Sequence, residues 1–519
     1  MTDRTDAIII GAGHNGLVCA SYLARSGMNV VCLESGDEAG GMAAPRSIGG
    51  NYHFPGLAHA SHPVSAAIRR DLKLDQFGYV PGKAIDTIAL DANGQHLSIG
   101  ENSVAGEGLS EKDENAYPKF REQFRVFAKA LRPLFDNKPP RLKNMGFADT
   151  MTLAKLGWNV RLGLGRETMN EFLRVAAMNI YDVLNDELDD DRLKGAIAAD
   201  AVLGNAMGPR TPGTVLTWLQ RLQGEFNGPM SLQSGGRSQL VHALTQSAED
   251  AGVSIRLNSH VKKILVENGK AFGVELSNGE MVKAKIIISN ADPRSTFSDL
   301  VGAPQLDAMF AHRVTQIRGS GVVAKLHLAL SGIPEFTGLA ESQLSNRLLI
   351  APTMKYVERA FNHSKYKEYS ENPVLEITLP SLHNSALAPD GHHVMSVSVS
   401  FVPYDLEGGW DEQKSTFAYK VISQLGQYSP DLKSLVVDHE FLTPRDIEEQ
   451  FHAVQGHWHH GDLSIHQSFM MRPVHGSAQY DTPVDGLFLC GAGSHPGGGL
   501  TGLPGQNAAK RVLKLGRAK

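Results

Sequence analysis

The sequence has few cysteines, no long hydrophobic run and no excess of one charge, and each absence excludes a class of protein. Its 519 residues include three cysteines, Cys19, Cys32 and Cys490, none in a C-x-x-C pair, which excludes a redox-active disulfide. Each lies in an apolar neighbourhood, so we expect buried thiols. The 50 Lys and Arg residues are balanced by 55 Asp and Glu residues, so we expect no nucleic-acid partner.

Targeting and membrane-spanning segments are also missing from the sequence. No apolar run approaches the roughly 20 residues that cross a bilayer. The first residues, "MTDRTDAIII", lack the basic and then apolar regions of a secretory signal. We therefore expect a cytoplasmic protein, and the chain length predicts two or three domains.

A dinucleotide-binding pattern opens the chain in "AIIIGAGHNGLVCASYLARSGMNVVCLES". An apolar strand is followed by G-x-G-x-x-G, a helix, a second strand and an acidic residue, in the register that this motif requires. The glycines allow a tight turn, a close approach to a pyrophosphate and close helix–strand packing, and the carboxylate suits ribose hydroxyls. The predicted cofactor contacts here are Gly11, Gly13, His14, Asn15, Gly16 and Glu34.

Further glycines favour FAD over NAD. Gly40 and Gly41 follow the acidic residue after a short loop, a second place where a backbone approaches the cofactor. A second G-x-G-x-x-G is absent. Near the other end, "GAGSHPGGGLTGLPGQNAA" follows an apolar run and ends in a predicted helix with Pro504 in its first turn.

Six segments carry a resemblance to a known family: "GAGHNGL", "GGMAA", "GGRSQL", "SNADP", "MRP" and "LCGAGSHPGGGLTGLPGQNAA". They span nearly the whole chain, in order. With them the sequence resembles the FAD-dependent phytoene dehydrogenase-like (carotenoid desaturase-related) family, in the branch of pyridine nucleotide-disulphide oxidoreductase domain-containing protein 2.

The resemblance implies an α/β fold with two interleaved parts. One is a glutathione-reductase-type FAD-binding Rossmann domain made of residues 1–70, 229–298 and 480–519. The other is an α+β substrate-binding or cap domain made of residues 71–228 and 299–479. Alternating apolar residues predict strands at 322–330 and 392–402 in the floor of a substrate chamber. Asn-Gly pairs at 268–269 and 278–279 predict hairpins.

More cofactor contacts follow from the resemblance. Val261 is expected to touch the adenine through its backbone, and Met42 stands where many relatives have an arginine that contacts the pyrophosphate. Charge neutralisation must then come from backbone donors or another residue, such as Arg46. We expect the C-terminal glycines to lie against the ribityl chain, pyrophosphate and isoalloxazine. The further predicted contacts are Asn290, Gly491, Gly493, Gly499, Leu500 and Thr501.

The resemblance implies hydride transfer from a C–C or C–N bond of a small, largely apolar substrate to flavin N5. The sequence does not disclose the electron acceptor, for which oxygen, a quinone or another carrier are the candidates. A redox-neutral isomerase, an amine oxidase-like enzyme and a flavoprotein with mainly a partner-binding role are the competing hypotheses. An amine oxidase should carry an aromatic cage before the last glycines, where only Tyr480 and Phe488 occur.

Histidines are the recurrent side chains near the predicted flavin segments. We name His62, His460 and His495 as candidates for proton transfer or substrate anchoring, and a purely structural histidine is the competing hypothesis for each. The cluster around 457–466 also suggests a metal, but its spacing matches no standard zinc pattern, so we expect none.

A mixed basic and apolar segment, "AKLGWNVRLGLGRETMNEFLRVAAMNIY", allows two interpretations. It could dock on a membrane surface, giving a peripheral membrane contact. It could instead pack into the core, which its discontinuous basic residues favour.

Overall fold

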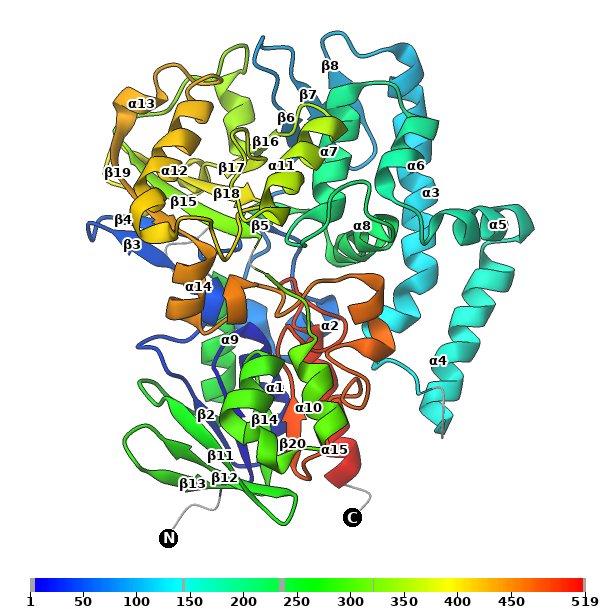
Figure 1. Cartoon of the computed structure of the whole chain (residues 1–519), viewed down its shortest axis with the longest axis vertical. Helices are drawn as coiled ribbons and strands as arrows, with labels where there is room; N and C mark the ends of the chain where they lie inside the picture. The colour runs from blue at the N-terminus through cyan, green and yellow to red at the C-terminus, as the bar shows by residue number, and fades with distance from the viewer. Residues whose placement is uncertain (1–4, 142–144, 233–238, 321, 517–519) are drawn as a thin grey trace.

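The computed structural model describes residues 5–141, 145–232, 239–320 and 322–516. They form two halves, one built on a parallel sheet and the other on a mixed sheet (Figure 1). The first and last elements of the chain lie in the same half, so the chain leaves this half and returns to it.

The parallel sheet has five short strands in the order β10, β2, β1, β14, β20. All five fall within the segments 1–70, 229–298 and 480–519. Every residue of β1 is buried, as expected for an inner strand covered on both faces. The strands are Ala7–Ile10 (β1), Val30–Leu33 (β2), Ser254–Arg256 (β10), Ile286–Ser289 (β14) and Leu487–Leu489 (β20).

Two layers cover this sheet. Helices α1 (His14–Arg25), α9 (Gln239–Asp250) and α15 (Leu503–Gly516) pack on one face around Ile9. An antiparallel meander of β11 (Val261–Glu267), β12 (Lys270–Leu276) and β13 (Met281–Lys283) packs on the other around Ile8. The first meander turn holds Asn268 and Gly269 at φ 50° and 74°, which confirms the predicted Asn-Gly hairpin. The first four residues of the "GGRSQL" segment, 235–238, lie outside the described residues.

The second half is built on an eight-stranded sheet in the order β19, β15, β18, β17, β16, β6, β7, β8. All neighbours are antiparallel except β16 and β6. The predicted strands at 322–330 and 392–402 are β15 and β18. The strands are Thr87–Ala89 (β6), Leu97–Ile99 (β7), Val104–Gly106 (β8), Val323–Leu330 (β15), Arg347–Ile350 (β16), Leu375–Thr378 (β17), His393–Ser400 (β18) and Val436–Leu442 (β19).

Helices complete the second half. The long helix α3 (Glu111–Asp136) buries an apolar stripe of Phe120, Phe124, Phe127 and Leu131, which recur at helical spacing. It packs with α7 (Asp191–Val202), α8 (Thr214–Leu222) and α11 (Met354–Lys365), while α12 (Trp410–Leu425) covers the sheet elsewhere. Together the two sheets confirm the predicted α/β class with an interleaved α+β part. The remaining helices are Ala66–Asp71 (α2), Ile180–Glu187 (α6), Ala308–Thr315 (α10), Leu432–Leu435 (α13) and Pro444–Phe451 (α14).

Packing crosses the predicted domain boundaries at two places. Residues 46–61, placed with the N-terminal segment, pack on the mixed sheet, where Phe54 joins Leu387 and Val394. This stretch contains the short strands β3 (Arg46–Ile48), β4 (Tyr52–Phe54) and β5 (Ala60–Ser61), the last paired with β9 (Ser231–Leu232). Conversely, α10 packs below the parallel sheet through Phe310 and Val314. Long-range apolar contacts, which local patterns do not show, decide both placements.

A helical arm projects from the side of the molecule (Figure 1). It consists of α4 (Phe147–Trp158), a π-helical turn at Asn159–Gly163 and α5 (Arg166–Val175), and it packs against α3. Within the ranges that the structure describes, no helix is both long and apolar enough to cross a membrane.

Candidate active site

One cavity of about 910 Å³ lies between the two sheets and is lined from both halves. Residues from segments far apart in the chain meet in its wall, including two of the three candidate histidines, His62 and His460. The predicted cofactor contacts that line the cavity are Gly11, Gly13, His14, Asn15, Glu34, Gly40, Gly41, Met42, Val261, Asn290, Gly499, Leu500 and Thr501.

The first glycine turn has the geometry that its motif requires. Gly11 has a φ of +92°, which favours glycine, and a Cβ on Gly16 would lie 2.2 Å from the carbonyl oxygen of Gly11. Gly16 therefore does not line the cavity but allows α1 to pack against β1. A Cβ on Gly13 would come within 2.8 Å of Asn290 Nδ2, so the turn and the residue after β14 lie side by side in the cavity wall and form what we call the cofactor cradle.

Glu34 holds this turn together in addition to facing the cavity. Its Oε2 accepts a hydrogen bond from the Ala12 N–H at 2.7 Å, and its Oε1 accepts one from the Gly36 N–H at 2.9 Å. A carboxylate at the end of β2 is thereby fixed at the cavity edge, where the ribose contact was predicted.

The double glycine forms a second close approach beside the first turn. Gly40 has a φ of +126° and donates its N–H to the Ala12 carbonyl at 2.9 Å. Met42 follows in the cavity wall. Arg46 also lines the cavity, and its Nε donates to Glu440 Oε2 on β19 at 2.9 Å. Its suggested role in neutralising the pyrophosphate stays a prediction.

The C-terminal glycines are required for more than one structural reason. A Cβ on Gly491 would lie 2.5 Å from the Asn290 carbonyl oxygen, and one on Gly493 would lie 2.4 Å from the Pro293 ring. Neither residue lines the cavity, so close protein packing explains both glycines and corrects our expectation that a cofactor ring excludes their side chains. Gly499 does face the cavity, and its carbonyl lies 3.2 Å from His14 Nε2, which joins the two glycine-rich ends.

His495 is fully buried away from the cavity. Its Nε2 lies 2.6 Å from the Leu134 carbonyl, and its ring lies between Phe135 and Phe469, with centroids 6.3 and 6.1 Å away. The Tyr480 hydroxyl donates to its carbonyl at 2.8 Å. The proposed catalytic role for His495 is therefore wrong on geometric grounds, and this histidine serves the structure instead.

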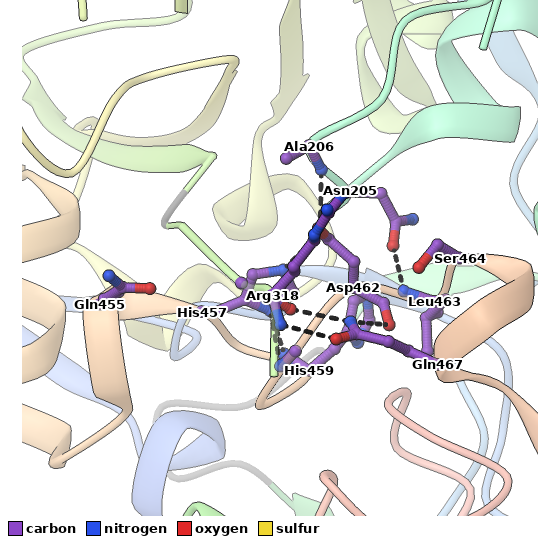
Figure 2. Close-up of polar contacts among 12 residues, drawn as sticks. Asn205, Ala206, Arg318, Gln455, His457, His459, Asp462, Leu463, Ser464 and Gln467 are labelled. Carbon is purple, nitrogen blue, oxygen red and sulfur yellow. Dashed lines mark hydrogen bonds and ion pairs between the residues drawn. The ribbon is translucent and has the colours of Figure 1, made fainter. Parts of the chain in front are cut away.

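A hydrogen-bonded loop contains His457 and His459 (Figure 2). His457 Nε2 lies 3.1 Å from Asp462 Oδ1, and Gln467 pairs with the backbone of Arg318 through bonds of 2.6 and 2.9 Å. Asn205 accepts from the Leu463 N–H at 2.8 Å, which ties the loop to the end of α7. His457 thus serves the loop itself. Among the described residues, no group of three or more side chains is arranged to hold a metal ion.

Three consecutive side chains of this loop line the cavity, and each has a nitrogen atom without a hydrogen-bond partner among the described residues. Trp458, His459 and His460 all line the cavity. Trp458 Nε1 and the Nδ1 atoms of His459 and His460 are buried and have no hydrogen-bond partner within the described residues. Burial lowers the pKa of His460 to about 4, so its imidazole is neutral at neutral pH. Buried polar atoms without partners are rare and indicate a ligand or ordered water.

His62 also faces the cavity, just after the short strand β5. Its Nδ1 lies 3.0 Å from the Gly228 carbonyl, which fixes the ring. Burial lowers its pKa to about 4. A neutral ring with one nitrogen engaged can still offer the other nitrogen to a substrate.

A buried polar network that the sequence analysis missed forms part of the opposite wall. His59 Nε2 lies 2.7 Å from Glu376 Oε1, and His59 Nδ1 lies 2.7 Å from Lys325 Nζ. Arg347 Nε donates to Glu376 Oε2 at 2.6 Å. Burial lowers the pKa of Lys325 to about 7 and that of His59 to about 4. The alternation predicted at 322–330 gave no sign that Lys325 faces polar partners.

The network ends in an ion pair that borders the cavity. Arg347 Nη2 donates to Asp200 Oδ1 at 2.7 Å, and Arg221 Nη2 lies 3.1 Å from the same oxygen. Asp200 and Arg221 both line the cavity, whereas Arg347 is 1% exposed and lies behind them.

The cavity fits FAD. Two glycine turns, at Gly11–Gly13 and at Gly40–Gly41, line the cavity beside the N-terminus of α1, and the free N–H groups of a helix N-terminus bind phosphates. Glu34 lies at the end of β2 in the same cavity wall. The buried Asn15 Oδ1 has no partner among the described residues and lies in the same wall. Cys19, Cys32 and Cys490 are free and buried, as predicted.

Sequence and structure comparisons agree with this geometry. The family model described as flavin containing amine oxidoreductase matches residues 16–513. The rat protein named pyridine nucleotide-disulfide oxidoreductase domain-containing protein 2 is 32% identical, over 98% of this chain and 93% of its own. Phytoene desaturase (lycopene-forming) from Pantoea ananas is 24% identical, over 98% of both chains. The solved structure of cyclohexylamine oxidase from Brevibacterium oxydans has a TM-score of 0.59 at 14% identity, covers 99% of this chain and 100% of its own, and shows the fold.

The fold and the cavity define an FAD-dependent oxidoreductase. The chain belongs to the flavin containing amine oxidoreductase family, in its phytoene desaturase-like branch.

Proposed function

We propose that this enzyme dehydrogenates a C–C or C–N bond of a small, largely apolar substrate. The observation that carries the proposal is the single cavity that joins the predicted FAD contacts to a chamber against the mixed sheet. Leu57, Leu203, Phe451 and Leu463 supply apolar wall beside the histidines. When bound, FAD supplies a hydride acceptor at N5, and the protein supplies binding, orientation and proton transfer.

We propose His460 as the group that accepts the substrate proton, with His62 as second candidate. Dehydrogenation removes a hydride and a proton, so a proton acceptor is needed near the flavin segments. The neutral ring of His460 has a buried, unpaired Nδ1 in the cavity wall. His62 has one nitrogen engaged with the backbone and is the less free of the two.

An amine oxidase-like activity is the nearest competing hypothesis. Tyr480 is fully buried and Phe488 lies in the core, so neither of the two aromatic residues ahead of the last glycines borders the cavity. This disfavours an aromatic cage formed by that segment. An isomerase that uses reduced flavin, or a flavoprotein with a partner-binding role, would bind FAD in the same cavity without consuming a reducing substrate.

The test is an anaerobic flavin-bleaching screen on the purified holoprotein. Isoprenoids, polyenes, cyclic amines and 2-enoyl compounds are added, and the oxidised-flavin absorbance is followed. We expect one C–C or C–N class to bleach the flavin, after which air or a quinone identifies the electron acceptor. If no compound bleaches a flavin that dithionite still reduces, the dehydrogenase proposal is wrong.

We also propose that the arm contacts an anionic membrane surface. Its apolar residues Phe147, Met151, Trp158 and Leu162 recur at helical spacing and are exposed, Phe147 by 84% and Trp158 by 67%. Core packing therefore does not account for this stripe, although the opposite face of the arm packs on α3. The exposed Lys155, Arg161 and Arg166 flank it, which favours anionic lipid over an uncharged partner.

A further inference from the structure

The strongest unexplained feature of the cavity is Arg221, at the C-terminal end of α8. Its side chain is 25% exposed and lines the cavity. Nη2 pairs with Asp200 Oδ1 at 3.1 Å and also lies 3.9 Å from Met230 Sδ. Within the described part of the chain, Nε and Nη1 donate to no partner, so an arginine with unused donors faces the chamber.

The charges around Arg221 do not cancel. Two arginines, Arg221 and Arg347, face two carboxylates, Asp200 and Glu376. Lys325, whose pKa burial lowers to about 7, adds a partial positive charge at neutral pH. Arg347 and Lys325 are each 1% exposed, so their charges are poorly screened by water. The carboxylates are already shared among these cations. An anion at the cavity wall would be attracted by the Arg221 side chain and by the protonated form of Lys325.

Neighbouring charged groups form pairs of their own and do not supply this anion. Arg121 Nη2 donates to Glu225 Oε1 at 2.6 Å, and Arg132 Nε donates to Asp136 Oδ2 at 2.8 Å. Each pair is internally neutral. Arg221 is therefore the cation of this cluster that reaches the cavity.

Arg221 belongs to the substrate side of the cavity. It is carried by the helices of the mixed-sheet half, beside Asp200 of α7 and Glu376 of β17. Its charge helps to lower the pKa of His62 and of His459, which places it near the histidines. We propose that Arg221 binds a carboxylate on the substrate, so that the substrate has an apolar body and one acidic end.

This inference rests on the proposed function but differs from it in what it predicts. An arginine guanidinium recognises carboxylates through charge-assisted hydrogen bonds, and the unused donors Nε and Nη1 of Arg221 are available to carboxylate oxygens. A hydrocarbon would leave the Arg221 donors unsatisfied in a partly dehydrated chamber, which is unfavourable.

The experiment uses matched ligands on the holoenzyme. Dissociation constants of 3-phenylpropanoate and trans-cinnamate are measured by calorimetry and flavin-absorbance change, and compared with those of 3-phenylpropan-1-ol and cinnamyl alcohol. We expect each acid to bind about 10- to 100-fold more tightly than its alcohol. Equal binding of acids and alcohols would overturn the inference.

Two variants and a control assign the effect to the residue. Arg221→Gln should remove the preference for acids, Arg221→Lys should retain part of it, and Arg445→Gln, at an exposed surface arginine, should leave it unchanged. Flavin content should stay at the wild-type level in all three. A preference that survives in Arg221→Gln, or loss of flavin from that variant, would overturn the inference, the latter because Arg221 would then serve the cofactor.

The two proposals can fail separately. Bleaching by neutral compounds with no preference for acids would leave the dehydrogenase and exclude the carboxylate site. A preference for acids that depends on Arg221, without bleaching by any compound, would establish the site and exclude the dehydrogenase.

Discussion

At the scale of single residues, two neighbouring glycines have separable roles. A side chain at Gly13 would meet only the end of the Asn290 side chain at 2.8 Å, whereas one at Gly16 would meet the Gly11 backbone at 2.2 Å. Gly13 has a φ of −64°, which other residues adopt easily. We therefore predict that Gly13→Val folds but retains little or no FAD, because the valine side chain and the displaced Asn290 occupy the cofactor cradle. Absorbance at the flavin band and the melting temperature measure both effects.

Gly16→Ala is the matched control. We expect it to lower the free energy of unfolding by about 1–3 kcal/mol, because the backbone of the turn must shift to admit the methyl group. A Gly13→Val protein with full flavin content would refute the placement of the cofactor.

At the scale of one element, the arm carries its apolar stripe on the side away from the core. We predict that Phe147→Ser with Trp158→Ser reduces binding to phosphatidylserine-containing vesicles at least about 10-fold, since each large side chain contributes on the order of 2 kcal/mol when buried. Co-sedimentation measures this. Met281→Ser, at a residue that is 61% exposed on β13, is the control and should bind as wild type does. Undiminished binding of the double variant, or no binding of the wild type, contradicts the membrane contact.

At the scale of the whole molecule, buried neutral histidines make the fold sensitive to acid. The pKa values of His59, His460 and His495 lie at about 4, lowered chiefly by burial, against about 6.5 in an unfolded chain. As the pH falls from 6.5 toward 4, the unfolded chain binds protons that the folded chain excludes, so stability falls. We predict that the free energy of unfolding drops by at least about 2 kcal/mol between pH 7 and pH 5, the contribution of one such histidine.

Denaturant unfolding of the holoprotein at the two pH values measures this drop. Replacing the exposed His312 with glutamine should leave the difference unchanged, whereas His495→Gln should make it smaller. Equal stability at both pH values would show that these rings are protonated in the folded protein.

The sequence by itself determined the features that depend on local backbone geometry. The glycine turn with its positive φ at Gly11, the Asn-Gly hairpin, the apolar stripe of α3 and the acidic end of β2 all require particular residue types at short spacing. Such requirements act within a few residues, so they are visible in the chain before it folds.

The tertiary structure alone decided which distant groups meet. The cluster of His59, Asp200, Arg221, Lys325 and Glu376 comes from five separate segments, brought together by the order of strands in the mixed sheet. Arg46 pairs with Glu440 because β3 lies beside β19, and His495 is absent from the cavity wall because α3 covers it. Ion pairs and buried hydrogen bonds form between groups a few ångströms apart in space, and their partners have no fixed separation along the sequence. Only the folded chain therefore shows them.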